Sequence, residues 1–285
     1  MVDRQKDFNL KLKKFDNSGK YSIVTGAAGL LGKMHVEALL ETNSNIIALD
    51  KNFKGLKKLK KDFENKFRDK KIIVFNLDIT NEKEIIKISK ILIKKKIFPE
   101  ILINNAGNNP KVKKSLNDQG FHRLESFEKK IWDQNLEINL TSYFLMIKIF
   151  GSLMAKKNKG IIINIASDLG LIAPNQNLYK LKNRSYFNQP VKPITYSISK
   201  HAITGLTKYV STYWSDRNVR CNTISPGGVL NNQSKSFLSK VSKQIPLGRL
   251  ALVDEYKSTI QFMCSDASSY MNGQNMVVDG GRSIW

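Results

Sequence analysis

A chain of 285 residues with 41% hydrophobic content is long enough for one large α/β domain with a full core. Its net charge is +23, from 47 lysines and arginines against 24 acids, and only eight of these cations are arginine. Because arginine is the usual residue for bidentate contacts with phosphates and bases, a lysine excess spread along the chain argues against a nucleic-acid partner. The basic field still attracts anionic substrates over long distances.

The cysteines, the N-terminal segment and the apolar runs narrow the class further. Cys221 and Cys264 lie far apart and outside any Cys/His cluster, so we expect buried, reduced thiols and no metal site. Residues 1–20 form a basic leader without the apolar stretch of a secretory signal. The most apolar run, Leu140–Ala155, is interrupted by Lys148 and is too short to span a bilayer. We therefore expect a cytoplasmic protein without a membrane partner.

After the leader, the sequence predicts a strand, a glycine turn and a helix. Residues 21–24 form a short apolar run, and the amphipathic helix that follows the turn extends to about residue 41. Gly26 makes the tight turn, Gly29 lets the backbone approach a pyrophosphate, and Gly32 lets the helix pack against the strand. The turn therefore predicts dinucleotide contacts from Thr25, Gly26, Gly29, Leu30, Leu31 and Gly32.

The next predicted strand, Asn45–Leu49, ends in an acid that is placed to bind a ribose. Asp50 lies 18 positions beyond Gly32, and a carboxylate there accepts hydrogen bonds from both ribose hydroxyls and repels a 2′-phosphate. We therefore predict NAD as the cofactor, with NADP less favoured. Lys51 and Lys54 weaken this preference, because either could pair with a 2′-phosphate.

Two further strands are predicted to end at the same edge of a sheet. Beyond a lysine-rich surface helix, the strand Ile72–Asn76 leads to Asp78 and Ile79. Asp78 either reaches the adenine amino group or caps the helix that starts at about Asn81. The strand Ile101–Ile103 ends in small and polar residues, at the edge where an open parallel sheet binds ligands. This edge adds three residues to the predicted cofactor site: Asn105, Ala106 and Gly107.

A tyrosine and a lysine four positions apart lie at the start of a helical segment, Tyr196–Asp216. Tyr196 and Lys200 therefore lie on one helical face. An ammonium beside a phenol favours the phenolate, so we expect the pKa of Tyr196 to fall below its usual value of about 10. Such a tyrosine can pass a proton near neutral pH.

The last two strands complete a single doubly wound α/β domain, a Rossmann fold with a parallel sheet, over residues 21–285. They are Val219–Ile224 and Met276–Val278. The turn that follows the first of them can pack on a nicotinamide. It adds three residues to the predicted cofactor site: Pro226, Gly227 and Val229.

Together these motifs occur in the order seen in short-chain dehydrogenase/reductases, and the chain resembles that family from about residue 21 to residue 281. The chain departs from the pattern in the glycine turn, where Leu30 stands in place of the family's commonest glycine, and this spacing is similar to the turn of its longer, sugar-nucleotide-modifying branch. It also lacks the threonine that the family often has a few residues after Val229. The motifs that carry the resemblance are Thr25–Gly32, Asp50, Asp78, Asn104–Gly107, Ile163–Ser167, Tyr196 with Lys200, and Ser225–Gly228.

The resemblance implies hydride transfer between a nicotinamide cofactor and a secondary alcohol or ketone. Tyr196 would be the acid in reduction and the base in oxidation, and Lys200 would lower its pKa and hold the nicotinamide ribose. Ser167 would bind the substrate oxygen, and Asn139 would anchor a water that relays the proton. The resemblance also implies a homodimer or homotetramer, which the apolar helix Leu140–Ala155 supports.

Two connections at the ligand edge are longer than is usual, Asn108–Phe127 and Leu171–Ile194. Their cations predict a small anionic substrate, such as a sugar phosphate or a nucleotide sugar. The chain also looks like the oxidoreductases of bacterial flagellin-modification and surface-glycan clusters, which act on sugars. The cations are Lys111, Lys113, Lys114, Arg123, Lys180, Lys182 and Arg184.

Two alternatives stay open at this point. A 3-oxoacyl-[acyl-carrier-protein] reductase would suit the basic surface, because its carrier protein is acidic, but such enzymes usually take NADPH and Asp50 argues against this. A non-catalytic nucleotide sensor or nucleic-acid binder belongs to another class. The complete set of Asn139, Ser167, Tyr196 and Lys200 argues against it, because a sensor has no need of all four.

Overall fold

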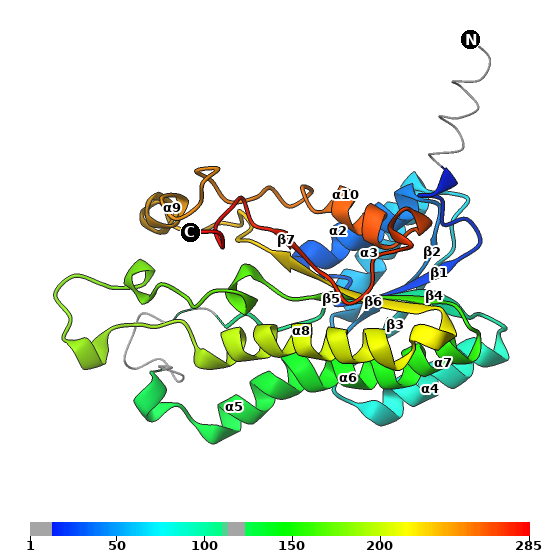
Figure 1. The fold of residues 1–285 in the computed structure, drawn as a ribbon, viewed down its shortest axis with the longest axis horizontal. Helices are drawn as coiled ribbons and strands as arrows, with labels where there is room; N and C mark the ends of the chain where they lie inside the picture. The colour runs from blue at the N-terminus through cyan, green and yellow to red at the C-terminus, as the bar shows by residue number, and fades with distance from the viewer. Residues whose placement is uncertain (1–12, 111, 113–122) are drawn as a thin grey trace, which may run out of the picture.

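Seven parallel strands form the centre of this computed structural model, which describes residues 13–110, 112 and 123–285 (Figure 1). Their order is β3-β2-β1-β4-β5-β6-β7, so the chain runs outward in one direction from β1 and in the other from β4. The predicted doubly wound parallel sheet is confirmed. Such sheets bind ligands where the order reverses, beside β1 and β4. The strands are β1 (Tyr21–Thr25), β2 (Asn45–Asp50), β3 (Ile72–Asn76), β4 (Pro99–Asn104), β5 (Gly160–Ile165), β6 (Val219–Pro226) and β7 (Asn275–Val278).

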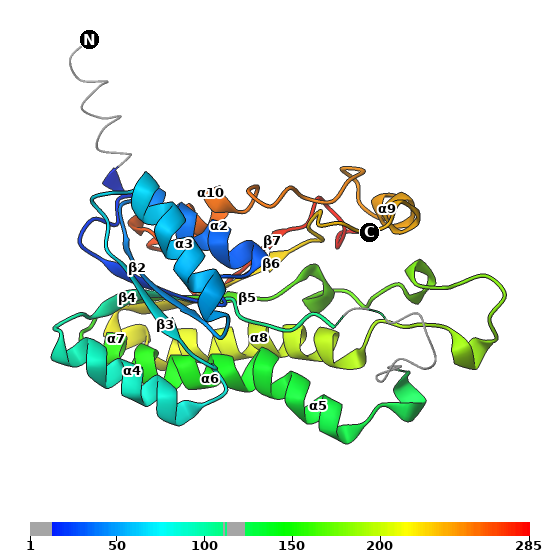
Figure 2. The same ribbon diagram turned by 180° about the vertical axis from the view of Figure 1, so that it is seen from behind.

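Helices cover both faces of the sheet (Figures 1 and 2). On one face lie α2 (Leu30–Glu41), α3 (Phe53–Lys66) and α10 (Lys257–Met263). On the other face lie α4 (Glu82–Lys94), α5 (Lys129–Leu136), α6 (Ser142–Met146), α7 (Ser152–Lys156) and α8 (Ile194–Tyr213). A short helix, α9 (Lys235–Ser242), packs on the connection after β5 through Leu178 and Val241.

The strand sequences explain this three-layer arrangement. Every residue of β5 is buried, as expected for a strand that is covered on both faces. Successive side chains of a strand point to opposite faces, so Ile23 and Val24 of β1 enter different cores. Val24 packs in the core beneath α2 and α10, and Ile23 packs in the core beneath α4 and α7.

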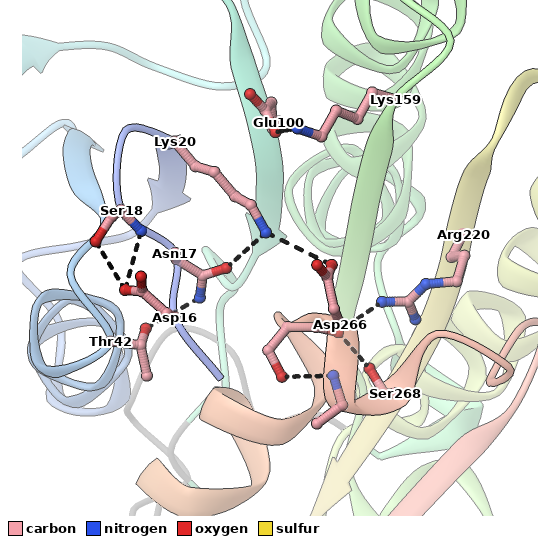
Figure 3. Close-up of polar contacts among 12 residues, drawn as sticks. Asp16, Asn17, Ser18, Lys20, Thr42, Glu100, Lys159, Arg220, Asp266 and Ser268 are labelled. Atoms are coloured by element: carbon pink, nitrogen blue, oxygen red, sulfur yellow. Dashed lines mark hydrogen bonds and ion pairs between the residues drawn. The ribbon is translucent and has the colours of Figure 1, made fainter. Parts of the chain in front are cut away.

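The predicted leader is shorter than expected, because residues 13–20 belong to the folded domain (Figure 3). Asn17 is fully buried, and its backbone and side-chain amides donate to Thr42 O at 2.7 Å and to Thr42 Oγ1 at 3.0 Å. Lys20 lies 3.6 Å from the Asp266 carboxylate, at the amino edge of the sheet. Residues 1–12 lie outside the described part of the chain.

The apolar run at Leu140–Ala155 is part of a longer helix than predicted. Residues 129–156 form one continuous helix in which two π-helical turns, Glu137–Thr141 and Ile147–Gly151, separate α5, α6 and α7. By length and composition, this is the one helix in the described ranges that could cross a membrane, and half of its most apolar window is buried inside the fold. Its buried side chains pack with β4, β5 and α4, so the core accounts for its apolar character.

Candidate active site

The glycine turn between β1 and α2 has the geometry that a pyrophosphate requires. Gly26 has φ +62°, and a Cβ there would lie 2.8 Å from the Ala106 Cα. A Cβ on Gly32 would lie 2.0 Å from the Gly26 carbonyl oxygen, so helix and turn are in direct backbone contact. Gly29 is the N-cap of α2, with no side-chain cap and no acid in the first turn. The first N–H groups of α2 therefore remain available to an anion.

Two predicted cofactor residues hold this turn in place. Thr25 is fully buried, and its Oγ1 accepts hydrogen bonds from the backbone N–H groups of Asn105 (2.9 Å) and Ala106 (3.0 Å). The Asn105 side chain donates back to the carbonyl oxygens of Thr25 (2.9 Å) and Gly26 (3.2 Å). Because these polar groups are engaged with one another, both side chains would contribute to cofactor binding through the backbone that they position. Leu30 and Leu31 follow the turn as the first residues of α2.

The two acids of the predicted adenosine site are fixed by local backbone bonds. The Asp50 carboxylate accepts from the N–H groups of Ala28 (2.9 Å) and Asn52 (2.8 Å), which leaves lone pairs on both oxygens for a ribose. Asp78 accepts from Thr80 N at 3.0 Å and Thr80 Oγ1 at 2.8 Å, and the backbone bond lowers the pKa of this carboxyl most.

The alternative role of Asp78 as a helix cap is wrong. The N-cap of α4 is Asn81, whose side chain accepts from the N–H of Glu84 at 3.3 Å. Asp78 is exposed, beside the buried Ile79, so its free oxygen stays open to an adenine. On the other side of the site, Gly227 is anchored by its N–H to the Val278 carbonyl at 2.9 Å. This bond fixes the turn Pro226–Val229 at the end of β6.

The predicted catalytic side chains come together at the carboxyl ends of β4 and β5. Lys200 is 4% exposed, and its ammonium donates to the Ile165 carbonyl at 2.7 Å. The Tyr143 hydroxyl donates to the same oxygen at 3.1 Å. Gly107 lies against this group, since a Cβ there would be 3.7 Å from Lys200 Nζ and 3.2 Å from Asn139 Oδ1.

The expected depression of the tyrosine pKa is not found. Burial raises the pKa of Tyr196 to about 12, and the nearby Ser167 side chain only partly opposes this effect. Lys200 Nζ lies 5.9 Å from the centre of the Tyr196 ring, and burial lowers the pKa of this lysine to about 7. The two residues share a helical face as predicted, but burial pushes both toward their neutral forms.

Asn139 lies in the first π-helical turn and is fully buried. Its Oδ1 accepts from the N–H of Asn108 at 2.6 Å, and its Nδ2 donates to the carbonyl of the same residue at 2.9 Å. Single π-turns inside α-helices are frequent at functional sites. The side chain therefore fixes the backbone after β4 beside Lys200, and the anchoring of a water by Asn139 stays a prediction.

A buried ion pair beside Ser167 was not anticipated from the sequence. Asp168 Oδ1 accepts from Ser167 Oγ and from Leu169 N, each at 2.8 Å, and Asp168 Oδ2 accepts from Arg282 Nη1 at 2.7 Å. The Asp168 and Arg282 side chains are at most 9% exposed. Their types and positions, directly after the serine and after Gly280-Gly281, carry no local signal of pairing.

The cations of the two long connections that the structure describes are not gathered at one site. Arg123 is bonded within the loops, to Glu125 (2.9 and 3.2 Å) and to the Tyr186 carbonyl (2.9 Å), with its guanidinium 4.5 Å from the Tyr186 ring. Arg123 therefore does not belong to the predicted anion site. Arg184 donates to the Asn188 carbonyl at 3.5 Å. Lys180 and Lys182 are exposed, and Lys111, Lys113 and Lys114 lie outside the described residues.

Cys221 and Cys264 are buried, free thiols, as predicted. Among the residues that the structure describes, no group of three or more His, Cys, Asp or Glu side chains could hold a metal ion.

A glycine turn after β1, an acid at the end of β2, a serine just after β5, and a tyrosine and lysine in the first two turns of α8 are together typical of a pyridine-nucleotide-dependent oxidoreductase. Residues 26–283 match a family model described as enoyl-(acyl carrier protein) reductase. The NAD-dependent glycerol dehydrogenase of Listeria innocua is 29% identical over 95% of this chain and 97% of that protein. The 2-dehydro-3-deoxy-D-gluconate 5-dehydrogenase of Bacillus subtilis is 30% identical over 94% and 96%, respectively.

A solved structure is also similar to this chain. The short-chain dehydrogenase of Leptospira borgpetersenii with bound NAD+ superposes with a TM-score of 0.78 at 28% identity, over 94% of each chain. The chain belongs to the short-chain dehydrogenase/reductase family.

Proposed function

We propose that the protein uses NAD(H) to interconvert a secondary alcohol and a ketone on a small polyhydroxylated substrate, such as a polyol, a sugar or a sugar acid. The observation that carries this proposal is the convergence of Ser167, Tyr196 and Lys200 beside an uncapped glycine turn. The names of the two relatives support the substrate class, since one is a glycerol dehydrogenase and the other acts on a deoxygluconate.

Tyr196, Ser167 and Lys200 have different roles in the proposed reaction. When bound, the nicotinamide supplies or accepts the hydride. With a pKa of about 12, Tyr196 stays protonated at neutral pH and can give its proton to the oxygen of a ketone. Ser167 orients that oxygen, and the Lys200 ammonium stabilises the negative charge left on the phenol. In oxidation the same tyrosine takes the proton back.

A substrate panel tests the proposal. Oxidation of polyols, aldonates, sugar phosphates and nucleotide sugars, and reduction of 3-oxoacyl thioesters on acyl carrier protein, are compared with NAD(H) and NADP(H). We expect the highest kcat/KM with a polyol, sugar or sugar acid. A preference for the thioester would instead establish the acyl reductase alternative, and a preference for a phosphorylated or nucleotide sugar would establish the narrower prediction of surface-glycan biosynthesis.

We predict that NAD(H) binds at least roughly tenfold tighter than NADP(H), which corresponds to about 1.4 kcal/mol. The reason is the Asp50 carboxylate, which is held at the end of β2 by Ala28 and Asn52 and would repel a 2′-phosphate. The variant Asp50→Asn removes the charge and keeps an acceptor for one of these two N–H groups, so it should narrow the difference between the two affinities. Calorimetry with both cofactors measures the ratio, and equal affinities in the wild type would contradict the assignment.

We also propose a homodimer or homotetramer, with α6 and α8 in the interface. These helices expose three aromatic side chains, Phe144, Tyr209 and Tyr213, of which the last two stack on each other at 5.7 Å. Exposed aromatic surface of this kind marks an interaction site. Light scattering should give a multiple of 32.4 kDa. The double variant Tyr209→Glu/Tyr213→Glu should shift the mass toward the monomer, whereas a monomeric wild type at micromolar concentration would refute the proposal.

A further inference from the structure

A second lysine lies against the catalytic tyrosine, and the predicted mechanism does not use it. Lys192 precedes α8 by two residues and is 8% exposed. Its ammonium lies 4.5 Å from the centre of the Tyr196 ring, which makes it closer to this ring than Lys200 is. The spacing Lys192, Tyr196, Lys200 places one lysine four positions before the tyrosine and one four positions after it.

The hydrogen-bond partners that the structure describes for this ammonium are neutral. Lys192 Nζ donates to Asn109 Oδ1 and, at 3.4 Å, to the Pro110 carbonyl oxygen. Within the described ranges, no acid lies within ion-pair distance of it. Asp168 attracts it from farther away, but that carboxylate is already paired with Arg282. A buried ammonium whose described partners are neutral is energetically unfavourable, and an anion that enters the site would offset this desolvation penalty.

The position of Lys192 is built by the long connection after β5. The Gln176 side chain bonds the Lys192 backbone twice: its Oε1 accepts from the N–H at 2.9 Å, and its Nε2 donates to the carbonyl at 3.5 Å. Three residues further on, the fully buried Thr195 Oγ1 accepts from Asn135 Nδ2 at 3.0 Å. The loop thus holds the ammonium beside the reacting phenol, whereas its own Lys180 and Lys182 stay exposed.

We infer that Lys192 binds a carboxylate of the substrate, so that the preferred substrate is a polyhydroxy acid and not a neutral polyol. This inference rests on the proposed function and names its substrate class. A carboxylate close to the reacting carbon can reach the ammonium while the carbinol oxygen meets Tyr196. A phosphate usually calls for several converging donors, often arginine, and Arg123 is bonded to Glu125 and to the loop backbone.

The lowered pKa of Lys192 predicts that the binding of an acidic substrate depends on pH. Burial lowers the pKa of this lysine to about 8, against a small opposing attraction by Asp168. The ammonium is therefore present below about pH 8 and is lost above it. Acid binding should weaken as the pH rises through this range, although a bound carboxylate shifts the transition upward.

The test compares D-gluconate with D-glucitol, two chains that differ at one end by carboxylate against alcohol. With the NAD+ enzyme, Lys192→Met should raise KM for gluconate at least tenfold and change that for glucitol by less than twofold. Lys192→Arg should keep most of the discrimination, and Lys180→Met, from the exposed part of the same loop, should change neither. Calorimetric binding of gluconate to the NADH complex should weaken in parallel and lose its pH dependence near pH 8.

The possible results separate a failure of the carboxylate inference from a failure of the proposed function. Equal changes for gluconate and glucitol in Lys192→Met would overturn the inference and leave the proposed function in place. A Lys192 effect on 6-phosphogluconate without one on gluconate would overturn the carboxylate assignment in favour of a phosphate. If the wild type oxidises neither compound and prefers a thioester, the proposed function fails, and the carboxylate assignment fails with it.

Discussion

Replacing Tyr196 by phenylalanine is expected to lower kcat by a factor of about 10² to 10⁴, the usual contribution of a positioned general acid. The variant keeps the half-buried ring, with Lys192 over its face, and removes only the hydroxyl that is proposed to give its proton to the ketone. The affinity for NADH and the melting temperature should stay near their wild-type values. Steady-state kinetics in both directions, with cofactor binding by fluorescence, measure these effects.

A surface tyrosine provides a matched control. Tyr270 is fully exposed and lies outside the proposed interface helices, so Tyr270→Phe should leave kcat unchanged. A loss in Tyr196→Phe no larger than in this control would show that another group moves the proton. The mechanism would then have to be reassigned.

Replacing Lys200 by methionine should lower activity and raise stability at the same time. Activity should fall by a factor of about 10² to 10³, as when one preorganised electrostatic donor is removed. The free energy of unfolding should rise near neutral pH by about 1 to 4 kcal/mol, because a desolvated ammonium is replaced by an apolar chain. The Ile165 carbonyl keeps a partner in the variant, since the Tyr143 hydroxyl also donates to it.

The shifted pKa of Lys200 determines how the stability difference between wild type and Lys200→Met changes with pH. The pKa of Lys200 is lowered to about 7 in the folded protein, below the ordinary value of 10.5, so the unfolded chain binds this proton more tightly. The destabilising effect is complete below about pH 7 and fades as the pH rises from about 7 to about 10. Chemical denaturation of wild type and Lys200→Met should therefore differ most at low pH, and the exposed Lys208→Met should show no such trend. A difference that is constant with pH would contradict the buried-cation assignment.

Local patterns predicted the strands other than β5, whereas the candidate catalytic residues Ser167 and Asn139 were assigned from the family resemblance. The predicted strand Ile72–Asn76 has the bounds of β3, and Tyr196 and Lys200 share a face of α8. Apolar runs, glycine turns and helical spacing act over a few residues, so they can be recognised without knowledge of the neighbouring strands.

Properties that depend on tertiary burial could not be predicted in the same way. The expected low pKa of Tyr196 was wrong, because the desolvation that raises it comes from the surrounding fold. Arg123 was assigned to a substrate, but its partner Tyr186 lies 63 positions further along the chain. Lys192 was overlooked, although its spacing from Tyr196 was visible, because only the folded loop shows that it is buried.

The ion pair between Asp168 and Arg282 also bears on the order in which the site can assemble. Its partners are separated by 114 positions, and closing such a long segment carries an entropic cost that local contacts do not share. During synthesis the carboxylate that accepts from the Ser167 hydroxyl leaves the ribosome well before its arginine does. The nascent chain can therefore form its nucleotide turn early, yet it acquires the final electrostatic surroundings of the serine only when the last strand has docked.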